Sequence, residues 1–175
     1  MNLNNLTLKT QEAIQTAQQY AFEKKHPQIE DEHLFYGLLE VDHNVVPFLF
    51  NKLDVDIEIL KGLNNKSLDK FSKVEGSTQM ISQKASKTLM NAVLIAKKQN
   101  DEFVAAEHLL ISLLDSSSSV SKMMLDNGIT MKNLENAIDE LRKGEKITSV
   151  NAEENYNALE KYAKNLNVLA TNGKL

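Results

Sequence analysis

Apolar residues along most of this chain recur with the spacing of an amphipathic α-helix. Between residues 8 and 24, one face carries Ala13, Ile14, Ala17, Tyr20 and Ala21. Between residues 83 and 98, the corresponding face carries Leu89, Ala92, Val93 and Ala96. No run shows the strict alternation of a β-strand, and the chain has only 6 Gly and 2 Pro. The pattern therefore predicts an all-α fold without strands.

These two helical segments belong to a duplicated sequence. Residues 29–39 read IEDEHLFYGLL and residues 104–114 read VAAEHLLISLL. Laying residues 6–41 over 81–116 without a gap gives eight identities, where ordinary composition would give roughly two. Thr7 and Ser82 stand at matching positions for helix N-caps. Apolar helices are expected to follow at about 30–41 and 105–115.

The duplication continues beyond the aligned block. Phe48-Leu49 match Met123-Met124, and then the offset drops from 75 to 74, so that the N-cap candidates Asp56 and Thr130 match, as do Leu60 and Leu134. Each repeat is therefore predicted to be a four-helix unit. Because each unit has an apolar face to bury, we expect a compact pair related by a pseudo-twofold axis. Two leucine pairs, Leu38/Leu113 and Leu39/Leu114, should then be buried at matching sites.

The repeats define the expected domain organisation. The duplicated domain spans residues 1–144, with the first repeat at about 1–66 and the second at about 80–144. The polar stretch NNKSLDKFSKVEGST, residues 64–78, is predicted to be an exposed linker. After a helix-end signal at Lys143-Gly144, the segment 145–175 is predicted to form a linker helix with no counterpart in the repeats.

Composition narrows the class of protein. The 175 residues are 42% hydrophobic and 25% charged, with a net charge of −4, which is typical of a soluble globular protein. The negative charge argues against broad nucleic-acid binding. The absence of cysteine from the sequence excludes disulfides and thiolate chemistry. No apolar run reaches the length of a membrane span, so a cytoplasmic protein without nucleic-acid or membrane partners is expected.

The sequence offers little catalytic chemistry. His33 and His108 match, and Glu30-x-x-His33 has the spacing used by di-iron bundles, but Ala105 replaces the second glutamate. Buried, hydrogen-bonded helix histidines are therefore favoured over metal ligands. The serines at 116–119 lack the strand-turn-helix context of a nucleophile and indicate a solvated loop. With no glycine-rich phosphate loop, this chain is expected to have no enzymatic activity, metal or cofactor.

Several motifs carry a resemblance to a known family. They are Leu-Thr at residues 6–7, Glu-His-Leu-x-x-x-Leu-Leu in each repeat, Val74-Glu75-Gly76, and ALEKYAKNLNVLATNGKL at 158–175. With them, the chain resembles the amino-terminal (Clp N) domain of ClpB-type AAA+ disaggregases, chaperones of the stress response. The resemblance implies that the paired repeats form a groove for unfolded or aggregated polypeptide. It also implies that the full-length protein is a homohexamer that threads substrates with ATP and magnesium and cooperates with the DnaK system. The present chain would be a monomer without nucleotide.

The resemblance also implies the residues that handle substrate: Thr7, Asp101, Glu107 and the apolar Leu89. Each of the three polar residues also has a purely structural interpretation. Thr7 suits a helix cap, Asp101 can accept from loop amides, and Glu107 lies in a helix first turn. At Asn91 and His108 the chain departs from apolar family positions, which implies a more polar groove.

Two other classes of function stay open. Within the same fold, the chain would be the adaptor-docking domain of a protease-associated Clp ATPase. Outside it, the chain would be a free-standing helical scaffold or a cryptic metalloenzyme. On the resemblance, the segment 145–175 is expected to be held least firmly, because its apolar stripe belongs beside an ATPase domain.

Overall fold

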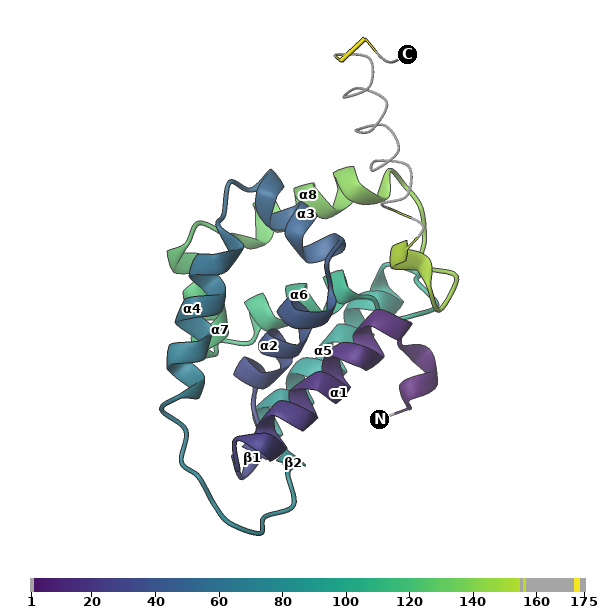
Figure 1. Ribbon diagram of the computed structural model, residues 1–175. Coiled ribbons are helices and arrows are strands. Elements are labelled where there is room, and N and C mark those ends of the chain that lie inside the picture. The colour runs from purple at the N-terminus through teal and green to yellow at the C-terminus, as the bar shows by residue number, and fades with distance from the viewer. Residues whose placement is uncertain (1, 155, 157–171, 174–175) are drawn as a thin grey trace.

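Helices make up most of the described chain. A computed structural model describes residues 2–154, 156 and 172–173, so most of the helix expected over 145–175 lies outside the described residues. After a short 3-10 turn, η1 (Leu3–Asn5), the first repeat contains α1 (Leu8–Glu23), α2 (Asp31–Val41), α3 (Val45–Lys52) and α4 (Ile57–Leu68). The second contains α5 (Gln83–Lys98), α6 (Ala106–Asp115), α7 (Ser119–Asp126) and α8 (Met131–Arg142). The predicted all-α class and the two four-helix repeats are confirmed (Figure 1).

The first helices of the two repeats begin and end alike. The side chain of Thr7 accepts from the amide of Thr10, and that of Ser82 accepts from the amide of Ala85, so both predicted N-caps are confirmed. Both helices have 16 residues. Past their ends, Lys25 and Asn100 both adopt φ of 60°, a left-handed conformation that stops a helix.

The one-residue slip in the repeat is confirmed too. Helices α4 and α8 each have 12 residues and begin 74 positions apart. Their N-caps are the predicted Asp56, which accepts from the amide of Glu58, and Thr130, which accepts from the amide of Asn133. In the preceding turns, Asp54 and Gly128 are both left-handed, with φ of 60° and 87°.

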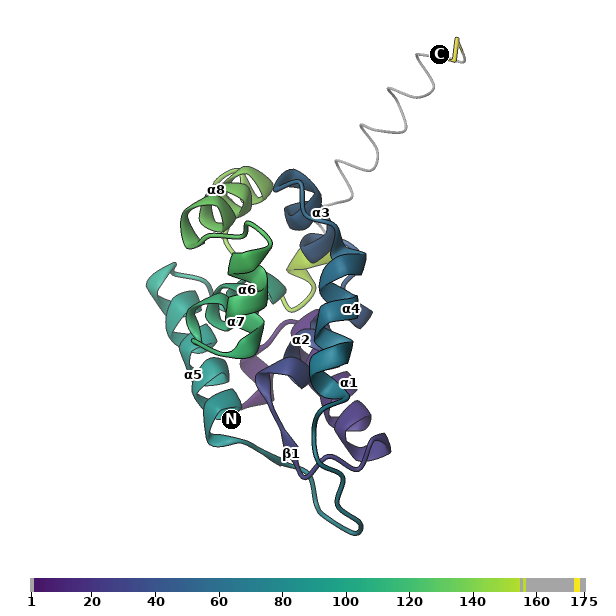
Figure 2. The ribbon, with the colours of Figure 1, turned by 90° about the vertical axis from the view of Figure 1, so that its left-hand side faces the viewer.

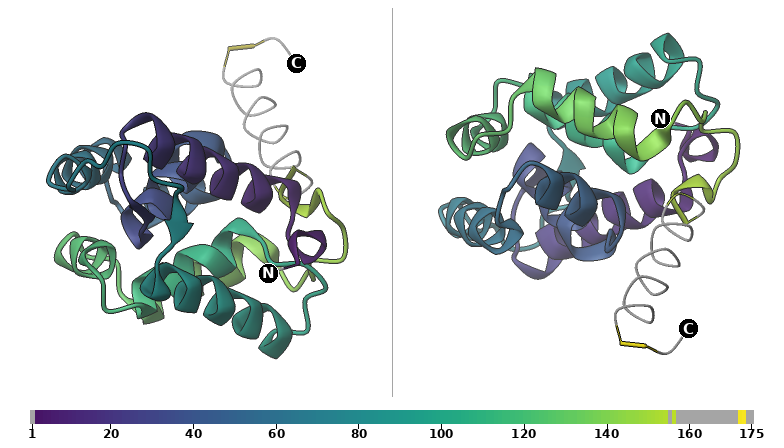
Figure 3. Two further views of the ribbon diagram at one scale, coloured as in Figure 1. Left: turned by 90° about the horizontal axis from the view of Figure 1, so that it is seen from below. Right: turned by 90° about the horizontal axis from the view of Figure 1, so that it is seen from above.

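The two repeats pack face to face, and Figure 3 shows them as two layers, purple to blue and teal to green. Contacts between them are exchanged: α1 touches α6 and α5 touches α2, while α3 touches α8 and α4 touches α7. A twofold relation requires such reciprocal pairs. The core between the layers contains both leucine pairs as expected, with Leu38 and Leu113 fully buried and Leu39 and Leu114 nearly so.

The expectation of a fold without strands is wrong in one detail. Two-residue strands β1 (Gln28–Ile29) and β2 (Met80–Ile81) pair in parallel, and a parallel bridge joins Leu6 to Val104. Adding 75 to Ile29 gives Val104, and subtracting 75 from Ile81 gives Leu6, so the two contacts are equivalent with the repeats exchanged. In each case the loop after the first helix of one repeat lies beside the residues that precede the first helix of the other. Backbone N–H and C=O groups in these extended segments need hydrogen-bond partners. Each repeat supplies them to the other in the same way, as the duplication requires.

The linker between the repeats is shorter than the polar sequence indicates. Helix α4 continues to Leu68, which is fully buried. Asn64 is also buried and donates from Nδ2 to the carbonyl of Glu32 at 2.9 Å. A mostly exposed loop then leads to β2, and in Figure 2 it extends beyond the helices at one end. None of the described helices has the length and apolar character needed to cross a membrane.

Candidate functional site: a buried polar cluster and two equivalent grooves

The four residues predicted to handle substrate are all buried. Thr7 and Glu107 have no exposed surface, and Leu89 and Asp101 are 4% and 8% exposed. Leu89 belongs to the apolar core. The structure brings Thr7, Asp101 and Glu107 into one polar cluster, and the structural readings of all three are confirmed: a helix cap, a loop-amide acceptor and an acid in a helix first turn. Their role toward substrate stays a prediction.

Arg142, at the end of α8, is the centre of this cluster. Its Nη1 lies 2.7 Å from Asp101 Oδ2, its Nη2 lies 2.9 Å from Glu107 Oε1, and its Nε donates to the same Glu107 oxygen at 3.0 Å. Burial lowers the pKa of Arg142, but the Glu107 and Asp101 carboxylates outweigh it and raise that pKa above its usual value. Sequence reasoning missed Arg142. The available signal was the 74-residue offset, which aligns this charged residue with the apolar Leu68 of the first repeat, a residue that is buried in the structure.

The two matching histidines are structural, as expected. His108 Nδ1 accepts from the Ala105 amide at 2.8 Å, and His33 Nδ1 accepts from the Glu30 amide at 2.9 Å. The ring proton therefore lies on Nε2. In His108 this nitrogen is 2.8 Å from Asp101 Oδ2, whereas in His33 it is 2.8 Å from His26 Nδ1. Burial, with a smaller effect of His26, lowers the pKa of His33 to about 4.

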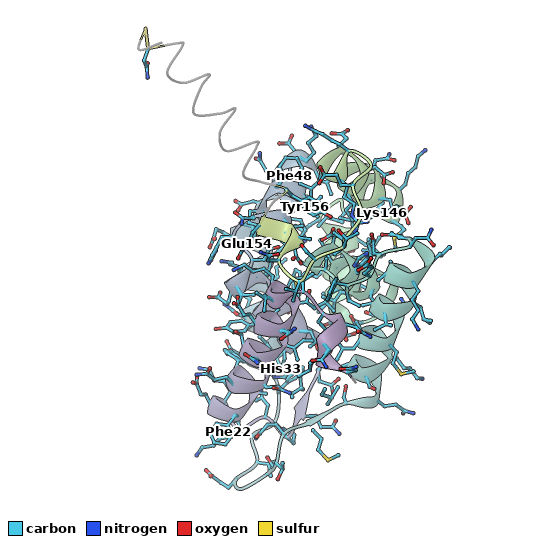
Figure 4. All side chains as sticks on the ribbon, turned by 90° about the vertical axis from the view of Figure 1, so that its right-hand side faces the viewer. Phe22, His33, Phe48, Lys146, Glu154 and Tyr156 are labelled. Carbon is cyan, nitrogen blue, oxygen red and sulfur yellow. The ribbon has the colours of Figure 1, made fainter. Side chains whose placement is uncertain are left out.

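A segment after α8, residues 147–154 with Tyr156, covers the polar cluster; we call it the clasp. The Ile147 amide donates to Asp101 Oδ1 at 2.9 Å, and the Tyr156 hydroxyl donates to Glu107 Oε1 at 3.4 Å. Figure 4 shows the chain passing from Lys146 to Tyr156 at one end of the helices. The buried clasp residues are Ile147, Ala152, Glu153 and Tyr156. How firmly the whole of 145–175 is held stays a prediction, because most of that segment lies outside the described residues.

Glu153 fixes the clasp to both repeats. Its Oε1 accepts from Thr7 Oγ1 at 2.6 Å and from the Ala106 amide at 3.0 Å. The second repeat has Ala105 at the N-cap of α6, so Glu153 supplies the carboxylate that this helix lacks. Nearby, the Leu8 amide donates to the Val150 carbonyl at 2.8 Å. The clasp therefore satisfies amides at the first turns of α1 and α6.

The pKa values of two carboxyl groups in the cluster shift in opposite directions. Burial alone raises the pKa of Asp101, but hydrogen bonds from His108, the Ile147 amide and Arg142 lower it to about 2. Burial, followed by the Glu107 carboxylate, raises the pKa of Glu153 to about 7. The Oε2 atoms of Glu107 and Glu153 are buried without a hydrogen-bond partner. In the docked clasp, two carboxyl groups with unsatisfied oxygens therefore lie close enough to repel each other.

A groove at the contact between the repeats is uncovered; we call it the open groove. It encloses about 520 Å³ where the first turns of α2, α5 and α7 meet. Its lining residues are Gln28, Glu30, Asp31, Glu32, Phe71, Ser82, Gln83, Lys84, Ser118 and Ser119. Asn91 instead lines a separate polar groove with Lys84, Lys87 and Asp115. Ser118 and Ser119, expected in a solvated loop, form the N-cap and first residue of α7.

Metal chemistry finds no support in this arrangement. Across residues 2–154, together with 156 and 172–173, no three His, Cys, Asp or Glu side chains are grouped so that they could hold a metal ion.

Comparison with known proteins decides the family. Residues 5–128 match the Clp repeat (R) N-terminal domain family. The chain belongs to this family. A chaperone protein ClpB of Bacteroides thetaiotaomicron is 42% identical over all 175 residues, which span 20% of the length of that relative.

Solved structures share the fold. The Hsp104 N-terminal domain from Candida albicans superposes with a TM-score of 0.77 at 20% identity, covering 85% of this chain and 99% of that one. A ClpV N-domain in complex with a VipB peptide superposes with a TM-score of 0.65 at 17% identity, covering 78% of this chain and 86% of that one. This chain is thus a Clp N domain of the ClpB type.

Proposed function

We propose that this chain is the domain with which a ClpB-type disaggregase engages unfolded or aggregated polypeptide. The observation that carries the proposal is the open groove between the repeats. It is not covered by any other segment of the described chain, and both polar side chains and the half-buried Phe71 line it. A surface of this kind suits a polypeptide segment, which offers backbone polar groups and occasional apolar side chains.

The chemistry of the groove supports a peptide ligand further. The amides of Asp31 and Gln83 lie in the first turns of α2 and α5, where helix geometry leaves N–H groups without partners within the helix. Carbonyls of a bound segment can accept from such amides. Met80 and Ile81, which immediately precede Ser82, are exposed and add apolar surface. The ClpV domain of the same fold is solved with a peptide bound, which agrees with this use.

The motor would lie outside this chain. In the full-length protein, we propose, the domain delivers substrates to a cytoplasmic homohexamer that uses ATP and magnesium to thread them through its pore, with help from the DnaK system. The chain spans only 20% of the length of its ClpB relative, so a full-length protein of that kind has room for such a motor.

Binding by this chain should be weak. A few apolar side chains, each contributing about 1.5–3 kcal/mol when fully buried, must offset association and ordering costs of several kcal/mol. The affinity is therefore expected to be roughly micromolar or weaker.

The test is a titration of a permanently unfolded, fluorescently labelled model protein, followed by anisotropy. Gln83→Trp fills the open groove from its rim, and Ser86→Trp places the same ring one helical turn away, where the residue is exposed and does not line the groove. We expect Gln83→Trp to weaken binding and Ser86→Trp to leave it unchanged. Equal affinities for both variants and the unmodified chain would exclude the open groove as the binding surface. Binding restricted to a folded adaptor protein would favour the adaptor-docking alternative.

A further inference from the structure

The pseudo-twofold relation places two equivalent pairs of helix starts in the molecule. Subtracting 75 from Ser82–Lys84 gives Thr7–Lys9, and adding 75 to Glu30–Glu32 gives Ala105–Glu107. Residues 30–32 and 82–84 line the open groove. Their counterparts Thr7 and Ala106 instead contact Glu153 of the clasp. One of two equivalent grooves is therefore uncovered, and the chain itself occupies the other.

The clasp lies in its groove as a peptide ligand would. It presents a backbone carbonyl, from Val150, to the amide of Leu8. Three residues later, the carboxylate of Glu153 meets Thr7 Oγ1 and the amide of Ala106. Three residues after that, Tyr156 places its hydroxyl beside Glu107. In the first two contacts, donors at the starts of α1 and α6 meet acceptors of the clasp, and in the third the clasp donates to a first-turn carboxylate of α6.

The fit of the clasp is incomplete. Glu107 Oε2 and Glu153 Oε2 are both buried without a hydrogen-bond partner, on side chains that are fully and 99% buried. Buried carboxylate oxygens left in this way weaken the contact. Three of the four residues predicted to handle substrate, Thr7, Asp101 and Glu107, contact the clasp. A polypeptide can reach them only when the clasp is out of the groove.

We infer that the groove under the clasp is a second peptide-binding site, for segments with an acidic residue followed three positions later by an aromatic one, and that the clasp occupies it in competition with substrate. The inference rests on the proposed function for its substrate class. Thr7 and the Ala106 amide hold the acidic side chain, while Glu107 and Arg142 face the aromatic hydroxyl. The site alternates between the chain's own segment and a bound polypeptide.

The experiment compares the unmodified chain with a clasp-release variant, Glu153→Arg/Tyr156→Ala, of the same length. The probe is a fluorescent peptide with the sequence of residues 146–157, KITSVNAEENYN. A tethered segment at millimolar effective concentration outcompetes the same peptide in solution, so release should tighten peptide binding by about a hundredfold. A peptide carrying the same two substitutions should not bind either protein. Thr7→Val in the released variant should abolish the gain.

A reversible lock tests the same groove without loss of packing. The chain has no cysteine, so Leu8→Cys/Val150→Cys introduces a single pair at exposed positions whose backbones are already hydrogen bonded. Oxidation should remove residual peptide binding, and reduction should restore it. The inference is overturned if a folded release variant binds the peptide no more tightly than the unmodified chain, or, should that variant not fold, if oxidation leaves peptide binding unchanged. Failure of the proposed function looks different, because unfolded protein would then ignore Gln83→Trp while the peptide still bound the released groove.

Discussion

Replacing Arg142 by leucine should be among the most damaging single changes in this domain. Leucine is the residue at the equivalent buried position, Leu68, so helix propensity and apolar fit are kept. The change removes the only cation that the structure places within 4 Å of Asp101 and Glu107 among the described residues. Breaking a buried ion pair by removing one partner costs about 3–5 kcal/mol. That is a large share of the roughly 5–15 kcal/mol that stabilises a typical domain.

The assay is urea and thermal unfolding followed by circular dichroism. For a chain of this size a loss of about 4 kcal/mol lowers Tm by roughly 8–16 °C. Lys132→Leu is the matched control, since it removes a cation from an exposed position on the same helix, and it should change stability by no more than about 0.5 kcal/mol. Adding Glu107→Gln to Arg142→Leu should recover part of the loss, because one uncompensated charge disappears. Equal Tm values for Arg142→Leu and Lys132→Leu would refute the assignment of Arg142 as the neutralising centre.

Three further predictions concern packing, protonation and the clasp. A Cβ on Gly37 would lie 2.0 Å from the carbonyl oxygen of Ala13, so Gly37→Ala should push α2 away from α1 and destabilise the fold by at least about 1–3 kcal/mol. Gly62→Ala is the control, because the added Cβ there meets nothing, and equal unfolding midpoints for the two variants would contradict the close approach of α1 and α2. The folded pKa of Glu153 is raised from 4.5 to about 7, so its contribution to the free energy of unfolding is fully present below pH 4.5 and is lost as pH rises to about 7, by up to roughly 3 kcal/mol. Glu153→Gln should remove this pH dependence from urea unfolding, and an unchanged pH profile would show that Glu153 is not buried as described. In hydrogen exchange, the amide of Ile147, bonded to Asp101, should exchange more slowly than that of the exposed Gly76, and comparable rates would mean that the clasp does not stay docked.

The sequence by itself determined the elements that depend on near neighbours. Apolar spacing marked the helices, and Thr7, Ser82, Asp56 and Thr130 marked their starts, because a cap acts on amides two or three residues away. The internal duplication then implied the pairing of two units, since each has one apolar face to bury. Even the deletion of one residue between repeats was readable, because it falls in a turn and leaves both helices intact.

Only the tertiary structure decided what lies across long separations in the chain. Arg142 neutralises Asp101 from 41 residues away, and Thr7 donates to Glu153 from 146 residues away. No local pattern encodes such pairs, because the partners become neighbours only after the helices have packed. The short strands arose in the same way, from loops of one repeat lying beside the entrance to the other. The contacts of Thr7, Asp101 and Glu107 with the clasp also depend on the tertiary structure, because the sequence of the clasp has no counterpart in the repeats and gave no periodic signal of the place where it docks.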